Sequence, residues 1–374
     1  MPETQISISD PRRSRRIAAR LLVVVAAVAV SLVIAEAALR IWAPRQPCVR
    51  FKQNVDELQH MNLTDLVVES DPELFWRLAP RQSRPARGFP FRGVISNGQG
   101  LRSEHEIPLE KPKKEIRILF LGDSCTFGHG LLPSETFVAQ VGQMLRSQFP
   151  GTQFECINAG VPGYSLFQGL RFFETQGFRF RPDLVVANFG FNDSAPWDNQ
   201  SDMDHHRRSL ASQPLHGLQW SRLCQIAWEV ASRPGNSNAA PRARLTGSEF
   251  FSLLARLDEV TRQQGSGLLL LALPYKVNLD PRFAPWERME FQGALTTYGR
   301  NALRLGPESD GVVDLIPILQ ELAVEEPVME LLFDHVHPTR MLNEHYARAI
   351  AAKLVPWVKS RLGDEARPQP PGTK

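Results

Sequence analysis

"ILFLGDSCTFGHG", residues 118–130, runs from four apolar residues straight into Gly-Asp-Ser and then into further glycines. An apolar run of this length bounded by glycine is typical of a strand that is buried on both faces. Ser124 follows that strand at its carboxyl end, where parallel sheets present residues to ligands. The stretch therefore predicts either a plain turn, in which Ser124 caps the next helix, or a nucleophile that a substrate can reach.

The rest of the chain alternates between apolar runs and amphipathic stretches. The runs are 116–122, 154–160, 183–190, 267–274 and 311–315, and the stretches are about 135–148, 165–177, 248–264, 286–304 and 339–360. This alternation predicts βαβ units and a parallel sheet with helices on both faces. Residues 194–247 interrupt it, because they are polar and lack a clear strand. We expect an insertion there, partly helical around 220–231, of the kind that often overhangs an active site, or a disordered loop in its second half.

Composition excludes some classes of function. The net charge is +3, and much of the excess lies in "PRRSRR" at residues 11–16, so no nucleic-acid face is expected. The four cysteines lack metal-site spacing, although a disulfide between Cys48 and Cys224 is one alternative. His205 and His206 are adjacent but have no further ligands at suitable spacing, so no metal is expected.

The N-terminal region contains an uncharged apolar run at residues 21–35. Extended over 17–41, it has about the 20 residues that a membrane-spanning helix needs. The basic residues before it place residues 1–16 in the cytoplasm and the main domain outside. Ala35-Glu36-Ala37 also resembles the cleavage site of a signal peptide, so an anchored and a secreted protein both remain open.

The predicted organisation follows from these features. It comprises a cytoplasmic basic N-terminus (1–16), a transmembrane signal-anchor helix (17–41), an extracytoplasmic lead-in (42–112), an α/β domain (113–362, with insertion 194–247) and a disordered tail (363–374).

A nucleophilic serine needs a base, a group that orients the base, and donors for an oxyanion. "LLFDHVHPT", residues 331–339, places Asp334 three residues before His337, so one loop can present a carboxylate and an imidazole together. His335 is a competing base. We favour His337, because adjacent residues in an extended segment point in opposite directions.

Two further loops follow predicted strands and offer oxyanion donors. The glycines of "NAGVPGYS" (158–165) let backbone N–H groups approach a ligand closely. "GFND" (190–193) offers the side-chain amide of Asn192. All of these features lie at the carboxyl edge of one predicted sheet, which favours a nucleophilic Ser124 over a plain turn.

With these blocks in this order, the chain resembles the SGNH hydrolases, also called the GDSL family, over about residues 115–360. The resemblance implies a flavodoxin-like three-layer α/β/α sandwich and ester hydrolysis or acyl transfer without a metal or cofactor. It implies Ser124 as nucleophile, His337 as base and Asp334 as the group that orients it. It also implies three oxyanion donors, the N–H groups of Ser124 and Gly160 and the amide of Asn192.

Two positions depart from the family pattern. Cys125 follows the serine where many relatives have a larger apolar residue, and "NEH" at 343–345 stands where a glycine is frequent. Neither position has a catalytic role, so the implied function is unchanged.

The front end is similar to exported bacterial members that are anchored by one N-terminal span, in "AEAALR" (35–40), "DPELFWRLAP" (71–80) and "NGQGLRS" (97–103). This similarity implies a single-pass protein of the bacterial inner membrane with a periplasmic catalytic domain. We expect the lead-in to pack on that domain, with Phe75 and Trp76 as its apolar contacts.

Three functions fit the sequence. The first is a serine esterase of the cell envelope that acts on acyl esters, acetyl esters above all, of a carbohydrate or lipid. The second is an O-acyltransferase that modifies an exported polysaccharide. The third is a non-enzymatic envelope protein on the same scaffold. The insertion has aromatic residues beside polar ones (Trp197, Trp220 and Trp228), which would suit glycans, although the same tryptophans could equally belong to the core.

Overall fold

The computed structural model describes residues 11–42, 68–71, 73–84, 94–198, 200–211, 221–224, 226, 242–280, 287–306 and 309–365. The chain forms two compact units. The first comprises residues 1–49 and 211–237, and the second comprises residues 50–210 and 238–374.

The first unit is built on one long helix, α1 (Pro11–Trp42). Its segment Ala19–Trp42, with a mean hydropathy of 2.6, is long and apolar enough to cross a membrane, a property that N-terminal signal sequences share. Glu36 interrupts the apolar stretch near its end. Its carboxylate accepts hydrogen bonds from the Ser221 hydroxyl (2.9 Å) and from the N–H groups of Arg222 (2.9 Å) and Leu223 (3.0 Å). The carboxylate thus has polar partners within its own unit.

The second unit is built around a five-stranded parallel sheet. Its strands are β5 (Glu115–Gly122), β6 (Gln153–Gly160), β7 (Leu184–Asn188), β10 (Gly267–Ala272) and β13 (Val312–Asp314). They correspond one by one to the five predicted apolar runs. The spatial order is β6-β5-β7-β10-β13. This is the flavodoxin-like order, in which the topology reverses beside the first strand and a ligand crevice forms at the carboxyl ends of the strands.

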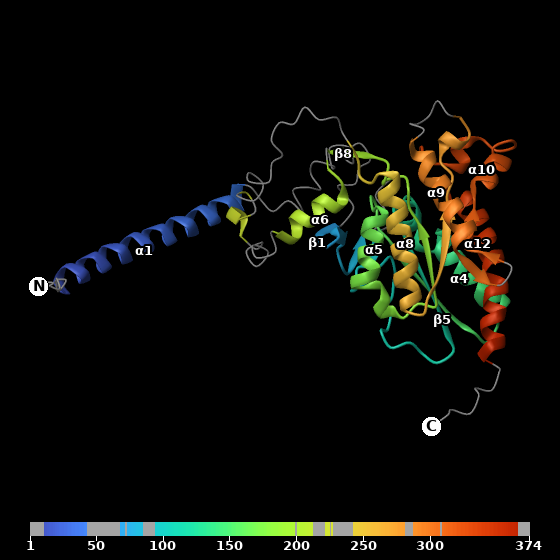
Figure 1. Cartoon of the computed structure of the whole chain (residues 1–374), viewed down its shortest axis with the longest axis horizontal. Helices are drawn as coiled ribbons and strands as arrows, with labels where there is room; N and C mark the ends of the chain where they lie inside the picture. The colour runs from blue at the N-terminus through green and yellow to red at the C-terminus, as the bar shows by residue number, and fades with distance from the viewer. Residues whose placement is uncertain are drawn as a thin grey trace, which may run out of the picture. The chain divides into compact units, whose positions relative to one another are not determined.

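Helices cover both faces of this sheet (Figure 1). α4 (Phe137–Gln148) and α12 (Arg340–Glu365) pack on one face, and α5 (Leu166–Thr175), α8 (Gly247–Gln263) and α9 (Glu287–Ala302) pack on the other. The predicted three-layer α/β/α sandwich is therefore confirmed. The short elements are α3 (Ser124–Phe127), η2 (Pro133–Glu135), η3 (Gly177–Phe180), η5 (Lys276–Asn278), β11 (Arg304–Gly306), β12 (Ser309–Asp310), α10 (Ile316–Leu322) and α11 (Val328–Leu331).

The central strands are buried on both faces. Ile118 and Phe120 of β5 join the core beneath α4 and α12. Leu119 and Leu121, which point to the opposite face, are 0% and 1% exposed. Burial on both sides explains why the strand reads as a continuous apolar run rather than an alternating one.

The described part of the lead-in packs as part of the second unit. It forms two antiparallel pairs, β1 (Val68–Asp71) with β2 (Phe75–Leu78) and β3 (Gln82–Arg84) with β4 (Val94–Ser96). Phe75 is 5% exposed and Trp76 is 1% exposed, which confirms both as packing contacts. The ring of Phe75 stacks on that of Phe167 of α5, with the centroids 5.9 Å apart.

The insertion differs from the sequence expectation. No strand was predicted in 194–247, yet β8 (Pro196–Asp198) pairs antiparallel with β9 (Arg242–Ala243), and α6 (Asp202–Ala211) lies between them. Strands this short have no readable periodicity, and they form because the two ends of the insertion meet. Of the predicted helical stretch 220–231, only 221–224 and 226 are described, and 222–224 and 226 are helical.

Three smaller expectations have outcomes here. α12 continues to Glu365, so residues 363–365 of the predicted disordered tail are helical. Cys224 is a free thiol, and Cys48, its proposed partner, lies outside the described residues. Trp220 and Trp228 also lie outside the described residues, as does the side chain of Trp197.

A buried carboxylate at the amino end of β7, that of Asp183, binds groups from three segments of the chain. Asp183 is 7% exposed, and it accepts a hydrogen bond from the N–H of Arg117 (2.8 Å). Lys111 and Arg361 both pair with the same carboxylate. Asp183 thereby connects β5, the segment before it, and the end of α12.

We expect Asp183→Ala to lower the free energy of unfolding by about 3 kcal/mol, because it leaves buried donors and two cations without their acceptor. Chemical denaturation of the full chain in detergent measures this loss. The control is Glu259→Ala, which removes an ion pair to Arg256 whose side chains are 46% and 52% exposed. It should change stability little, and an equal loss in both variants contradicts the prediction.

Candidate active site

Ser124 begins α3, directly after β5. Its Oγ lies 2.8 Å from His337 Nε2, and His337 Nδ1 lies 2.6 Å from Asp334 Oδ2. A carboxylate at Nδ1 requires the proton on that nitrogen, which leaves Nε2 as an acceptor for the serine hydroxyl. The structure therefore brings the three predicted residues together in the order that serine activation needs.

The loop before α12 fixes the orientation of His337. Asp334 Oδ1 accepts hydrogen bonds from the N–H groups of Val336 (2.8 Å) and His337 (2.9 Å), while Oδ2 binds the imidazole. Burial by itself would raise the pKa of Asp334, but these hydrogen bonds hold it well below its usual range. His335, the competing base, is exposed to solvent, whereas His337 is 2% exposed.

His129 is a site residue that sequence reasoning missed. Its ring stacks on that of His337, with the centroids 4.2 Å apart and an angle of 26° between the planes. Burial, followed by repulsion from His337, lowers the pKa of His129 to about 3, so the ring is uncharged at neutral pH. The signal was present in "GHG", a histidine between two glycines that closely follows the serine.

Asn192 is linked to the turn that carries Ser124 by a hydrogen bond to Asp123. Its Nδ2 donates to Asp123 Oδ2 (3.1 Å) and to the carbonyl of Tyr164 (3.1 Å). Asp123 also caps α3, since its Oδ1 accepts from the N–H of Cys125 (2.9 Å). Burial raises the pKa of Asp123 to about 6, against that hydrogen bond. The Asn192 amide already has two acceptors, so it must release one of them to bind an oxyanion.

Gly160 is held in a different role from the expected one. Its N–H, which was expected to bind an oxyanion, donates instead to Asn158 Oδ1 (2.9 Å). A Cβ at this position would lie 2.3 Å from the backbone nitrogen of Phe127. Glycine is thus required for the end of β6 to pack against α3.

Gly163, in the same loop, has the features that were expected of Gly160. It is half-buried and adopts a φ of +80°, a conformation that glycine accepts readily. Within the described residues, no acceptor binds its N–H. The sequence signal was the Pro162-Gly163 dipeptide, which typically marks a turn.

Asp193, the residue after Asn192, connects the loop after β7 to a neighbouring segment. Asp193 is fully buried, and its two oxygens accept from the N–H groups of Leu166 and Gly190, both at 2.7 Å. Burial raises the pKa of Asp193 to about 7. Asp193 therefore binds the loop after β7 to the start of α5.

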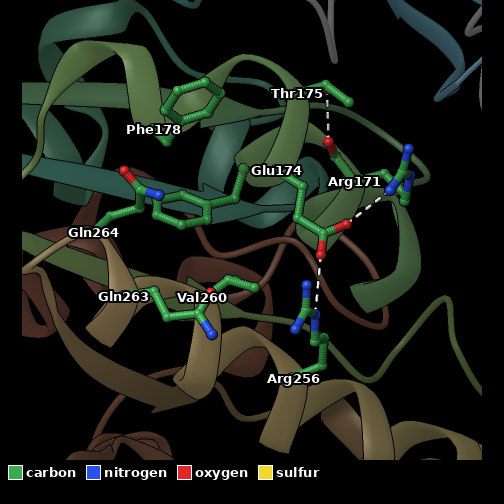
Figure 2. A pocket seen from close by; sticks show the side chains of 9 residues that line it. Arg171, Glu174, Thr175, Phe178, Arg256, Val260, Gln263 and Gln264 are labelled. Atoms are coloured by element: carbon green, nitrogen blue, oxygen red, sulfur yellow. Dashed lines mark hydrogen bonds and ion pairs between the residues drawn. The ribbon is translucent and has the colours of Figure 1, made fainter.

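A separate pocket of about 360 Å³ lies between α5, η3 and α8 (Figure 2). Arg171 and Arg256 line it, and both pair with Glu174, as Figure 2 shows. Neither Ser124 nor His337 lines this pocket.

Among the described residues, no group of three His, Cys, Asp or Glu side chains could hold a metal ion. His206, one of the two adjacent histidines, has its Nε2 2.9 Å from Glu73 Oε2.

Comparison with known proteins gives one family and several similar structures. The sequence model of the GDSL-like lipase/acylhydrolase family matches residues 120–344. A lipase/acylhydrolase from Enterococcus faecalis is 19% identical, and the alignment covers 64% of this chain and 95% of that one with a TM-score of 0.42. Axe2, an acetylxylan esterase from Geobacillus stearothermophilus, is 18% identical over 64% and 94%, with a TM-score of 0.44. An alpha/beta hydrolase enzyme from the metagenome of Lake Arreo, Spain, is 17% identical over 66% and 96%, with a TM-score of 0.42. No curated protein sequence matches the chain.

The raised pKa of Asp193 predicts a pH-dependent stability. In the unfolded chain this carboxyl loses its proton near pH 4, whereas the folded chain holds it to about pH 7. Between these values the folded state binds more protons at Asp193, so the contribution of this carboxyl to the free energy of unfolding falls as pH rises. Asp193→Asn should remove this contribution, so its stability should fall less than that of the wild type between pH 5 and pH 7.5, and the unfolding midpoints of both proteins at the two pH values measure the difference.

Asp204→Asn is the control for this prediction. Burial would raise the pKa of Asp204, but hydrogen bonds from Ser201 and the charge of Arg207 outweigh it and lower the pKa, the opposite direction to that of Asp193. Its replacement should leave the change between pH 5 and pH 7.5 as in the wild type. Equal changes in the wild type and Asp193→Asn would contradict the assignment.

Proposed function

The chain belongs to the GDSL-like lipase/acylhydrolase family, and we propose that it cleaves acyl esters in the cell envelope through an acyl-enzyme formed on Ser124. Family membership makes it a hydrolase of the type that acts on ester bonds. The observation that carries the finer proposal is the hydrogen-bonded series Ser124, His337 and Asp334, with distances of 2.8 Å and 2.6 Å.

The reaction follows from these contacts. Ser124 Oγ attacks the acyl carbonyl as His337 Nε2 takes its proton, and the hydrogen bond to Asp334 stabilises the resulting imidazolium. His337 then returns the proton to the leaving alcohol, and the acyl group stays on Ser124. A water molecule then attacks the acyl carbon as His337 takes its proton, the bond between the acyl carbon and Ser124 Oγ breaks, and His337 returns the proton to Oγ as the acid leaves. The uncharged ring of His129 packs on the imidazole throughout.

The oxyanion donors are assigned from the hydrogen bonds that are already made. Ser124 is the first residue of α3, and the N–H groups at the start of a helix have no acceptor within the helix, so the Ser124 N–H is assigned as one donor. The Gly163 N–H replaces that of Gly160, because Gly160 is bonded to Asn158. Asn192 supplies the third donor by exchanging the carbonyl of Tyr164 or the carboxylate of Asp123 for the oxyanion.

The location of the enzyme is proposed from α1. Four arginines lie in residues 12–16, ahead of the apolar segment, which favours a cytoplasmic N-terminus and an exported second unit. We assign α1 as a signal anchor of a bacterial inner membrane, with secretion after cleavage as the alternative. The catalytic domain is assigned to begin within the lead-in, because β2 packs on α5.

The substrate is proposed to be an acyl ester, with an acetylated glycan favoured. A polysaccharide acyltransferase would use the same acyl-enzyme with a sugar hydroxyl in place of water. The two differ in the fate of the acyl group, so kinetics decide between them.

We expect Ser124→Ala to lower the rate of ester hydrolysis by at least about 10³-fold, since no other group replaces the nucleophile. The full chain in detergent is incubated with p-nitrophenyl acetate and, separately, the butyrate, and nitrophenol release is followed. Ser252→Ala, at an exposed serine of α8, is the control and should keep full activity. A stoichiometric burst without turnover would support the transferase, and equal rates in wild type and Ser124→Ala would refute the proposal.

Asp334→Asn tests the orientation of the base. The amide can present a donor to His337 Nδ1, which favours the wrong tautomer, so kcat should fall by about 10²–10⁴-fold with little change in KM. Asp258→Asn, on α8, is the matched control and should keep its kcat. A variant of Asp334 that retains more than half of the wild-type kcat would remove this residue from the mechanism.

A further inference from the structure

We propose that Trp76 and Arg244 are positioning residues for the reaction, because they fix the direction of the peptide groups around Gly163. The inference rests on the proposed function, in which the Gly163 N–H is an oxyanion donor. It assigns a role in catalysis to the lead-in, which lies before the matched residues 120–344, and to the insertion.

Three consecutive carbonyls of this loop each accept a hydrogen bond from a side chain. Pro162 O accepts from Trp76 Nε1 (3.1 Å), Gly163 O from Arg244 Nη1 (2.5 Å), and Tyr164 O from Asn192 Nδ2 (3.1 Å). Residues 161–165 belong to no helix or strand, so no regular backbone ladder orients these groups. The side-chain donors orient them instead.

The bond from Trp76 acts directly on the catalytic donor. The carbonyl of Pro162 and the N–H of Gly163 belong to one planar, trans peptide group and therefore point in opposite directions. When the indole N–H holds this carbonyl, the direction of the Gly163 N–H is set as well. The Tyr164 N–H closes this turn by donating to the Val161 carbonyl (3.1 Å), but turns with that bond occur with the central peptide group in either of two orientations. Gly163 has no Cβ and a φ of +80°, so the indole contact is what selects one orientation.

Trp76 is in turn positioned by Tyr164, a residue of the same loop. The Tyr164 hydroxyl donates to the carbonyl of Trp76 (2.7 Å), and their rings pack edge to face with the centroids 6.0 Å apart. A Cβ on Gly163 would lie 3.2 Å from the indole ring, so the ring covers this side of the loop. Gln168 of α5 donates to the carbonyl of Leu74 (2.7 Å), which fixes the turn before β2.

Arg244 is a buried, charged donor on the next peptide group. Its guanidinium binds both oxygens of Asp202, at 3.0 Å and 2.8 Å, and the side chains are 5% and 0% exposed. It also lies 5.7 Å from the ring of Trp76. Because Asp202 begins α6 and Arg244 follows β9, the two ends of the insertion together hold Gly163.

Trp76→Phe is the sharpest test, since it removes the indole N–H and keeps an aromatic ring. In the full chain in detergent, kcat should fall by about 10- to 100-fold, somewhat less than the loss on deleting an oxyanion donor outright. KM and the midpoint of the pH–rate profile should stay unchanged, because His337 is untouched. The rate at which an alkyl fluorophosphonate labels Ser124 should fall in parallel, since that reaction also develops an oxyanion.

Two further variants act on the same loop by other contacts. Tyr164→Phe removes the hydroxyl that holds Trp76, and Arg244→Lys keeps the charge beside Asp202 but cannot span Asp202 and Gly163 together. Both should lower kcat by about 5-fold or more without a change in KM, as weaker versions of the loss of a positioned donor. Trp357→Phe and Tyr298→Phe are the matched controls, in α12 and α9, and should react as the wild type does.

The outcomes separate this inference from the proposed function. The inference is wrong if Trp76→Phe has the wild-type melting temperature, is labelled as fast as the wild type and turns over substrate as fast. If Trp76→Phe does not fold, rates within two-fold of wild type in both Tyr164→Phe and Arg244→Lys overturn it. A wild type that is neither labelled nor active removes the proposed function, and this inference with it.

Discussion

The alignment of three parallel strand ends is the constraint on which the site depends. Gly122, the last residue of β5, is in register with Gly160 of β6 on one side and with Asn188 of β7 on the other. The loops that follow therefore start at the same edge of the sheet, and they carry Ser124, Gly163 and Asn192. A Cβ on Gly122 would lie 2.1 Å from the hydroxyl of Thr126 and 2.9 Å from the carbonyl of Asn188. Only glycine lets the chain turn into α3 this close to its neighbours.

Polar side chains at these strand ends are buried, and they are satisfied by backbone groups. Asn158 donates to the carbonyl of Thr126 (2.8 Å) and accepts from the N–H of Gly160 (2.9 Å). Asp193 accepts from two backbone N–H groups in the same way. Burial of such groups is unfavourable unless every partner is in place, so they favour one arrangement of the loops over others. This explains why loops without regular secondary structure can hold reacting groups at fixed distances.

The lead-in before the sheet and the insertion between β7 and β10 both contact a loop at the edge of the sheet. β2 of the lead-in and the ends of the insertion contact the loop at residues 162–164 from different directions. The family match begins at residue 120, yet the second unit buries Trp76 to 1% exposure. The compact second unit therefore extends beyond the part that the family match covers.

The sequence by itself determined the sheet and the positions of Ser124, Asp334 and His337. Five apolar runs became five parallel strands, and local motifs placed Ser124 after β5 and Asp334 and His337 on one loop. Local signals suffice there because strand burial and short spacings are written in adjacent residues. Only the tertiary structure decided which N–H groups of "NAGVPGYS" are already bonded, that His129 stacks on His337, and that Trp76 donates to the carbonyl of Pro162. These outcomes depend on hydrogen bonds and packing between residues far apart in the chain, 86 positions for Trp76 and Pro162, and no local pattern encodes such partners.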